Sequence, residues 1–283
     1  MTSTRNDSLT PVGDSARPGG PSQVGAPLLR LDHLSRAFGG VFATRDVSVD
    51  VPRGELRGII GPNGAGKSTL FNLISGHLRP GSGTVTFNGR RIDGLAPHRR
   101  ARLGIAIVFQ GARLFPRMSV LENVMVGAHA RTRAGLLSSV LRLPVQRAEE
   151  RRIVEWSRDA LRQVGLAEWA DRDAATLPLG QQRRLQVARA LVSDPELLLL
   201  DEPASGLRAG ERAELAQLLL ELRSTGVTIM LVEHDVAMVT RLADTITVLD
   251  LGEVIAEGNP DEIRRNQRVI DAYLGVEAPG AGH

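Results

Sequence analysis

The chain has 283 residues, of which 42% are hydrophobic and 24% charged, and its formal net charge is +3. This composition is ordinary for a globular protein with a sizeable core. The absence of cysteine excludes disulfide bonds and thiolate metal sites and fits a reducing compartment such as the cytoplasm. No apolar run approaches the roughly 18 residues that span a bilayer, and no signal-peptide core is present, so we expect neither insertion nor export.

The N-terminal part of the chain changes character near residue 28. Residues 1–27 are rich in Ser, Thr, Gly and Pro and lack apolar periodicity, which predicts a disordered leader. Strands are predicted over 28–37, 41–51 and 56–60. Phe38 follows the first strand, where its ring could stack on an adenine base or simply pack at the strand end.

A glycine-rich segment follows the third predicted strand and opens a helix. It fits the pattern G-x-x-x-x-G-K-[ST] and consists of Gly61, Pro62, Asn63, Gly64, Ala65, Gly66, Lys67, Ser68 and Thr69. The glycines let backbone N–H groups point at phosphate oxygens, and the helix adds the positive end of its dipole. Lys67, the only lysine in the chain, can reach the β- and γ-phosphates, and the Ser68 hydroxyl can ligate Mg²⁺. This phosphate-binding loop, residues 61–69, predicts nucleotide binding.

The middle of the chain mixes short elements with a basic insert. A hairpin is predicted over 84–87 with an Asn88-Gly89 turn, then a short helix over 97–103 and a strand over 104–109. Gln110 ends that strand, where its amide could contact a metal or water or be a solvated loop residue.

A capping box of Ser119 and Glu122 predicts the start of a helix. From 127 to about 164 the chain is basic and helical in character. These charges form either a solvated face or a contact with phospholipid head groups or an acidic partner.

Two later strands each end on residues with reactive side chains. The apolar run before Asp201 and Glu202 predicts a strand buried in a parallel sheet, with both carboxylates at its carboxyl end, where such sheets bind ligands. A second run over 227–232 leads to His234, whose role depends on its neighbours. The crossover helix between them presents one apolar face, formed by Leu215, Leu218, Leu219 and Leu222. The chain is predicted to end with a strand over 245–250, a hairpin turn at Gly252, a helix near 266–274 and a frayed tail over 277–283.

The order of these motifs resembles that of the ATP-binding subunits of ABC transporters, over about 28–276. The most distinctive match is Leu177-Pro178-Leu179-Gly180-Gln181, which is similar to the ABC signature. Several stretches resemble the branched-chain amino acid importer type, namely 36–40, 111–115, 127–150, 181–185 and 266–275. The resemblance implies an α/β fold, with a P-loop NTPase core, an antiparallel β subdomain and an α-helical signature subdomain over about 111–192.

The resemblance also implies chemistry, cofactors and residue roles. It implies ATP hydrolysis with Mg²⁺, in which Asp201 holds the metal through water, Glu202 orients or deprotonates the attacking water and His234 steadies the γ-phosphate. It assigns catalysis to Glu202, His234 and Gln110, metal contacts to Ser68, Gln110 and Asp201, and nucleotide contacts to Phe38, the phosphate-binding loop, Leu179, Gly180 and Gln181. Two residues depart from the family pattern: Pro178 replaces the usual Ser, and Arg208 replaces the usual Asp or Asn.

The implied partners are two membrane permeases, a second related ATPase that completes a dimer and, indirectly, a solute-binding protein, with the chain on the cytoplasmic face of the membrane. No nucleic-acid partner is expected. One alternative is a soluble ABC-type ATPase acting on nucleic acid or ribosomes, although such proteins usually carry two cassettes or a long coiled coil. Another is a regulatory nucleotide-binding module without turnover, against which the joint presence of Gln110, Glu202 and His234 argues.

Overall fold

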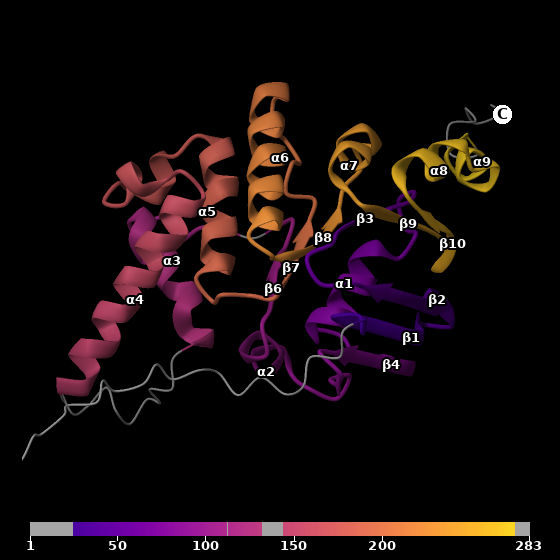
Figure 1. Ribbon diagram of the computed structural model, residues 1–283, viewed down its shortest axis with the longest axis horizontal. Helices are drawn as coiled ribbons and strands as arrows, with labels where there is room; N and C mark the ends of the chain where they lie inside the picture. The colour runs from indigo at the N-terminus through magenta and orange to yellow at the C-terminus, as the bar shows by residue number, and fades with distance from the viewer. Residues whose placement is uncertain (1–24, 112, 132–143, 275–283) are drawn as a thin grey trace, which may run out of the picture.

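Two β-sheets of different kinds form the frame of the protein (Figure 1). The computed structural model describes residues 25–111, 113–131 and 144–274. Most of the predicted leader and all of the predicted tail therefore lie outside the described residues. The structure confirms the predicted α/β class and the antiparallel β part.

The smaller sheet is antiparallel, with the strand order β2-β1-β4-β5. Its strands are β1 (Leu29–Phe38), β2 (Val41–Val51), β4 (Ser82–Phe87) and β5 (Arg90–Arg91). The β4–β5 pair confirms the predicted hairpin at Asn88-Gly89, and both of these residues have positive φ, as the turn requires.

The larger sheet is parallel except for one edge strand and has the order β10-β9-β3-β8-β7-β6. Its strands are β3 (Leu56–Ile60), β6 (Ile105–Val108), β7 (Leu197–Asp201), β8 (Thr228–Val232), β9 (Thr245–Asp250) and β10 (Glu253–Gly258). Every residue of β3, β7 and β8 is buried, which explains their continuous apolar runs. The carboxyl ends of these three central strands lead to the loop 61–69, to Glu202 and to His234.

The two faces of the larger sheet pack against different elements. On one face, Leu197 and Leu199 pack with α1 (Lys67–Ser75) and the smaller sheet. On the other face, Leu198 and Leu200 pack with α6 (Ala209–Ser224) and α7 (Val236–Leu242). Figure 1 shows α6 and α7 on the side of the sheet opposite α1. The predicted apolar face of α6 is confirmed, because Leu215, Leu218, Leu219 and Leu222 are its buried residues.

The remaining helices lie at the two ends of the larger sheet. At one end are α2 (Pro97–Arg102), α3 (Val120–Gly127), α4 (Pro144–Gln163) and α5 (Leu179–Leu191), with short 3-10 turns at Ala128–Ala130, Ala167–Trp169 and Ala174–Thr176. The capping box of Ser119 and Glu122 is present at the start of α3. Of the basic insert predicted from 127 onward, residues 132–143 lie outside the described residues. No helix in the described part of the chain has the length and apolar character that a bilayer crossing needs.

At the other end of the sheet, α8 (Pro260–Arg265) and α9 (Gln267–Leu274) follow β10. The final helix agrees with the prediction, but α8 was not predicted. Its signals are local: Asn259 caps the helix, Pro260 occupies its first turn, and Glu262 completes a capping box.

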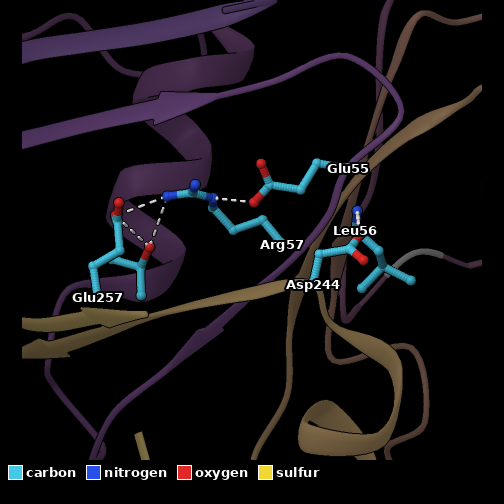
Figure 2. A network of polar contacts seen from close by, with 6 residues as sticks. Glu55, Leu56, Arg57, Asp244 and Glu257 are labelled. Atoms are coloured by element: carbon cyan, nitrogen blue, oxygen red, sulfur yellow. Dashed lines mark hydrogen bonds and ion pairs between the residues drawn. The ribbon is translucent and has the colours of Figure 1, made fainter. Parts of the chain in front are cut away.

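A buried arginine joins β3 to the far edge of the larger sheet (Figure 2). Arg57 is 3% exposed and lies between two carboxylates, with Nε 2.8 Å from Glu55 Oε1 and Nη1 2.7 Å from Glu257 Oε2. The Thr247 hydroxyl also accepts from Arg57 and donates to Glu257. Since Arg57 on β3 is paired with Glu257 on β10 and bonded to Thr247 on β9, this Arg57 cluster fixes β10 against β3 and β9.

Candidate nucleotide site

The phosphate-binding loop follows β3 and has a backbone shape that requires glycine. Gly61, Gly64 and Gly66 have φ angles of 151°, 82° and 102°. A Cβ on Gly61 would lie 2.0 Å from the Leu249 carbonyl oxygen, and one on Gly66 would lie 2.1 Å from that of Ala43. The loop is therefore wedged between β2 and β9 and held in a curled shape that suits phosphate oxygens.

Lys67 begins α1 and folds back over the loop. Its Nζ donates to the carbonyl oxygens of Gly61 at 2.7 Å and Pro62 at 2.9 Å. Burial lowers the pKa of Lys67, while the charges of Glu202 and Asp201 oppose that shift. The ammonium group of the chain's one lysine thus lies in a partly desolvated position beside the loop, where its field on a bound phosphate is strong.

Asp201 is the last residue of β7 and lies beside the loop. Ser68 Oγ donates to Asp201 Oδ1 at 3.5 Å, which joins the two residues expected to contact a metal. Burial is the main cause that raises the pKa of Asp201, and the neighbouring charge of Glu202 raises it further. A bound divalent cation would offset both effects.

Glu202 lies just beyond β7 in a left-handed conformation, with φ of 50°. The orientation of the Glu202 side chain is therefore not set by the simple alternation of side chains along a strand. The turn sets it instead, and the Glu202 N–H donates to the Val232 carbonyl of β8 at 2.9 Å. A positive φ at a glutamate is uncommon and is typical of functional sites.

The structure brings the three predicted catalytic side chains together. Glu202 Oε1 lies 2.5 Å from His234 Nε2, and Glu202 Oε2 accepts a hydrogen bond from Gln110 Nε2. Each comes from the carboxyl end of a different parallel strand: β6, β7 and β8. The Glu202 carboxylate is buried, whereas His234 and Gln110 are exposed and can be reached by a ligand.

The donor set at this edge fits Mg²⁺ held together with a nucleotide. Across the described ranges, no group of three or more His, Asp or Glu side chains forms a complete metal site. Mg²⁺ at nucleotide sites is bound by one or two carboxylates together with waters and substrate phosphates, so a full protein cage is not needed. Ser68, Asp201 and Gln110 supply the oxygen donors that such an ion prefers.

The signature segment, residues 177–181, lies apart from the phosphate-binding loop. Pro178 precedes α5 without a side-chain cap, and the Gly180 N–H donates to Glu211 Oε1 at 3.3 Å. Figure 1 shows α5 well separated from α1. Within the part of the chain that the structure describes, no hydrogen bond or ion pair links segment 177–181 to residues 61–69.

Phe38 lies at the tip of the β1–β2 hairpin. Phe38 is 46% exposed, and the Arg36 guanidinium lies 4.9 Å from the centroid of its ring. Both roles predicted for Phe38 fit this position, because an exposed ring at a hairpin tip suits stacking on a base as well as cation–π packing with Arg36 alone.

Two carboxylates near the site were missed in the sequence. Glu211 joins the starts of α5 and α6, since its Oε2 also accepts from the Arg208 N–H at 2.9 Å. Glu233 lies between β8 and His234 and accepts the Ala204 N–H at 2.7 Å. A carboxyl directly after an apolar strand was a visible signal for Glu233, whereas the α5 contact of Glu211 depends on tertiary packing.

Comparison with known proteins identifies the family. Residues 44–205 match the family model for ABC transporters, and residues 253–279 match that of the branched-chain amino acid ATP-binding cassette transporter. The chain belongs to the ABC transporter family. It is an ATPase subunit of that family.

Individual ABC transporter proteins are similar over nearly the whole chain. The high-affinity branched-chain amino acid transport ATP-binding protein LivG of Salmonella typhimurium is 43% identical over 250 residues, which are 88% of this chain and 98% of LivG. A solved ATP-binding cassette of an ABC transporter in its ADP conformation has a TM-score of 0.77 and 32% identity, over 88% of this chain and 98% of the other. A bacterial ABC transporter cassette solved as a dimer has a TM-score of 0.68 and 26% identity, over 82% and 98%.

Proposed function

We propose that this ABC ATPase powers the import of branched-chain or related amino acids through partner permeases. The observation that carries the proposal is that one chain contains two features. The first is a nucleotide site in which Glu202 lies between His234 and Gln110. The second is a C-terminal segment, 253–279, that matches the branched-chain amino acid type. The C-terminal match and the name of the LivG relative support the solute class, because selectivity itself belongs to subunits outside this chain.

The loop 61–69 binds the phosphates of ATP, with the charge of Lys67 directed at the β- and γ-phosphates. Ser68, Asp201 and Gln110 would hold Mg²⁺, which when bound neutralises negative charge on the phosphate oxygens. Asp201 would hold the ion through water, and the charge of the ion would offset the burial and the neighbouring carboxylate that raise the pKa of Asp201.

Glu202 acts as the base that orients or deprotonates the attacking water. His234 and Gln110 position the Glu202 carboxylate from both sides. The backbone N–H of Glu202 is also held, because it donates a hydrogen bond to β8. A base fixed in this way contributes about 10²- to 10⁴-fold to the rate. His234 is exposed, so it can also contact the γ-phosphate and link the state of the nucleotide to the position of Glu202.

A second related ATPase completes the site across a dimer. Leu179, Gly180 and Gln181 are too far from their own phosphate-binding loop to contact its nucleotide, and the start of α5 is exposed at Pro178 and Leu179. Backbone N–H groups at the start of α5 would therefore meet the γ-phosphate bound by the partner. Pro178 offers neither a hydroxyl nor an N–H there, so the half-site built from this signature is the weaker one.

The permeases dock against the surface between β6, α3 and α5. A cavity of about 400 Å³ opens there, lined by Ile107, Val108, Arg113, Phe115, Val126, Gly127, Gln186, Arg189 and Ala190. Phe115 is 45% exposed at its rim, and Asn123 holds the Phe115 backbone through both its N–H and its carbonyl. An apolar side chain held in an exposed position fits a surface that a protein partner covers. This docking places the chain on the cytoplasmic face of the membrane, with the solute-binding protein on the other side.

The proposal is tested by co-purification with candidate permease subunits that are expressed together with this chain. Leu114, the residue before Phe115, is partly buried against the core. Changing both Leu114 and Phe115 to Asp is expected to detach the subunit while ATP binding stays within about twofold of wild type. Leu251→Asp serves as the matched control, because Leu251 is 79% exposed on the distant β9–β10 turn. Retention of the double variant on the permeases would place the docking surface elsewhere, and failure of the wild-type chain to bind any permease would defeat the transport role itself.

A further inference from the structure

Glu233 is a buried carboxyl next to the nucleotide site and has no assigned role in the mechanism above. It is 4% exposed and lies between the end of β8 and His234. Its Oε1 accepts a hydrogen bond of 2.7 Å from the N–H of Ala204, a residue that is 5% exposed. This bond joins the segment that ends β8 to the loop that follows Glu202.

Keeping a carboxyl at this position is unfavourable for packing alone. Burial raises the pKa of Glu233, and the nearby charge of Glu202 raises it further, while the N–H groups of Ala204 and His234 oppose the shift. An apolar side chain would avoid that desolvation but would leave the buried Ala204 N–H without this acceptor. The acceptor, rather than the bulk of the side chain, is therefore what Glu233 contributes.

The loop that Glu233 holds extends from the base toward the signature helix. Within it, the Ser205 N–H donates to the Glu202 carbonyl at 3.2 Å, and the Leu207 N–H donates to the Ala204 carbonyl at 3.1 Å. The Ser205 carbonyl accepts from Arg183 Nη2 on α5 at 3.2 Å. A continuous set of contacts thus runs from His234 and Glu233 through the loop 204–207 to α5.

We propose that Glu233 is a positioning residue that ties the loop 204–207 to the strand end carrying His234, so that His234, the loop and α5 move together. The inference rests on the proposed function, in which His234 responds to the γ-phosphate and α5 presents the signature to the partner. Without the tie, the loop and the strand end move separately, and hydrolysis slows although nucleotide still binds to residues 61–69.

Two variants of the full-length chain separate hydrogen bonding from charge. Glu233→Gln keeps the length and the Oε1 acceptor but removes the charge. Glu233→Asp keeps the charge but withdraws the carboxyl by about 1.5 Å, beyond hydrogen-bond reach of Ala204. We expect kcat for ATP to fall about tenfold in Glu233→Asp, with KM unchanged, and to stay within about threefold of wild type in Glu233→Gln. Glu221→Asp, on the exposed side of α6, is the matched control.

Amide hydrogen exchange gives a second readout that does not depend on activity. Glu233→Asp should speed exchange of the Ala204 amide about tenfold, and Glu233→Gln should restore protection. Equal kcat and equal exchange in the Asp variant and wild type would overturn the inference, as would equal losses in both variants. If the wild-type chain hydrolyses no ATP in the complex with its partner ATPase, the proposed function fails, and the exchange pattern alone decides whether Glu233 holds the loop.

Discussion

Two charged clusters lie toward opposite ends of the central strands of the larger sheet and differ in how their charges are balanced. At the amino end, Arg57 lies between Glu55 and Glu257, and Figure 2 shows its guanidinium directed at both carboxylates. At the carboxyl end, Asp201 and Glu202 lie side by side, and Lys67 donates its hydrogen bonds to loop carbonyls rather than to either carboxylate.

The difference shows which cluster serves the fold and which serves the reaction. Charges that are paired inside the protein have little left to offer a ligand, and removing one partner leaves the other buried and uncompensated. Like charges held together are unfavourable until a cation or a charged substrate arrives. The Arg57 cluster therefore stabilises the sheet edge, whereas the Asp201 and Glu202 pair stabilises the bound state.

The largest effect is expected from removing the ammonium of the nucleotide site. Lys67→Ala should abolish measurable ATP hydrolysis and weaken ATP binding by at least about tenfold, because the side chain supplies charge to the ligand and not to the core. Thermal unfolding should change little, since the hydrogen bonds that Lys67 donates within the described part of the chain go to two carbonyls of the loop. Unchanged ATP turnover in the purified variant would contradict the proposal that the carboxyl-end cluster serves the reaction while the Arg57 cluster serves the fold.

A smaller effect, on stability instead of catalysis, is expected at the Arg57 cluster. Arg57→Met should lower the free energy of unfolding by about 3–5 kcal/mol, because Glu55 is left buried without its partner. The folded fraction should hydrolyse ATP at a normal rate. Arg30→Met is the control: its ion pair with Asp50 is exposed and screened by solvent, so the loss in denaturant unfolding should be much smaller than in Arg57→Met. Equal losses in the two variants would show that the Arg57 cluster does not stabilise the sheet.

The smallest expected effect is a gain in stability, whereas Arg57→Met is expected to lose stability. The native fold raises the pKa of Asp201, so the folded state binds that proton more tightly than the unfolded chain, and stability falls as pH rises above the ordinary value of 3.8. Without ligand, Asp201→Asn should raise the unfolding temperature by about 2 °C at pH 7, and the difference should shrink toward pH 4. A variant less stable than wild type at pH 7 would show that the carboxylate is well compensated in the fold.

How much the sequence predicted depends on how local each feature is. The loop 61–69 and the capping box of Ser119 and Glu122 are set by neighbouring residues, so a pattern finds them. The meeting of Gln110, Glu202 and His234 was also predictable, since the carboxyl ends of parallel strands share one edge of a sheet. The left-handed turn at Glu202 and the pairing of Arg57 with Glu257 were not, because contacts between distant segments decide them.

The central claim is that nucleotide binding belongs to residues 61–69 while the chemistry belongs to Glu202, and one variant tests it most directly. Glu202→Gln keeps the size and hydrogen bonding of the side chain but removes the proton acceptor. In the complex with its partner ATPase, the hydrolysis rate and the affinity for ATP should be measured together. We predict a rate about 10²- to 10⁴-fold lower with affinity within about threefold of wild type, and therefore an ATP-bound dimer that persists in size-exclusion chromatography. Near-wild-type hydrolysis, or a loss of affinity as large as the loss of rate, would contradict the account.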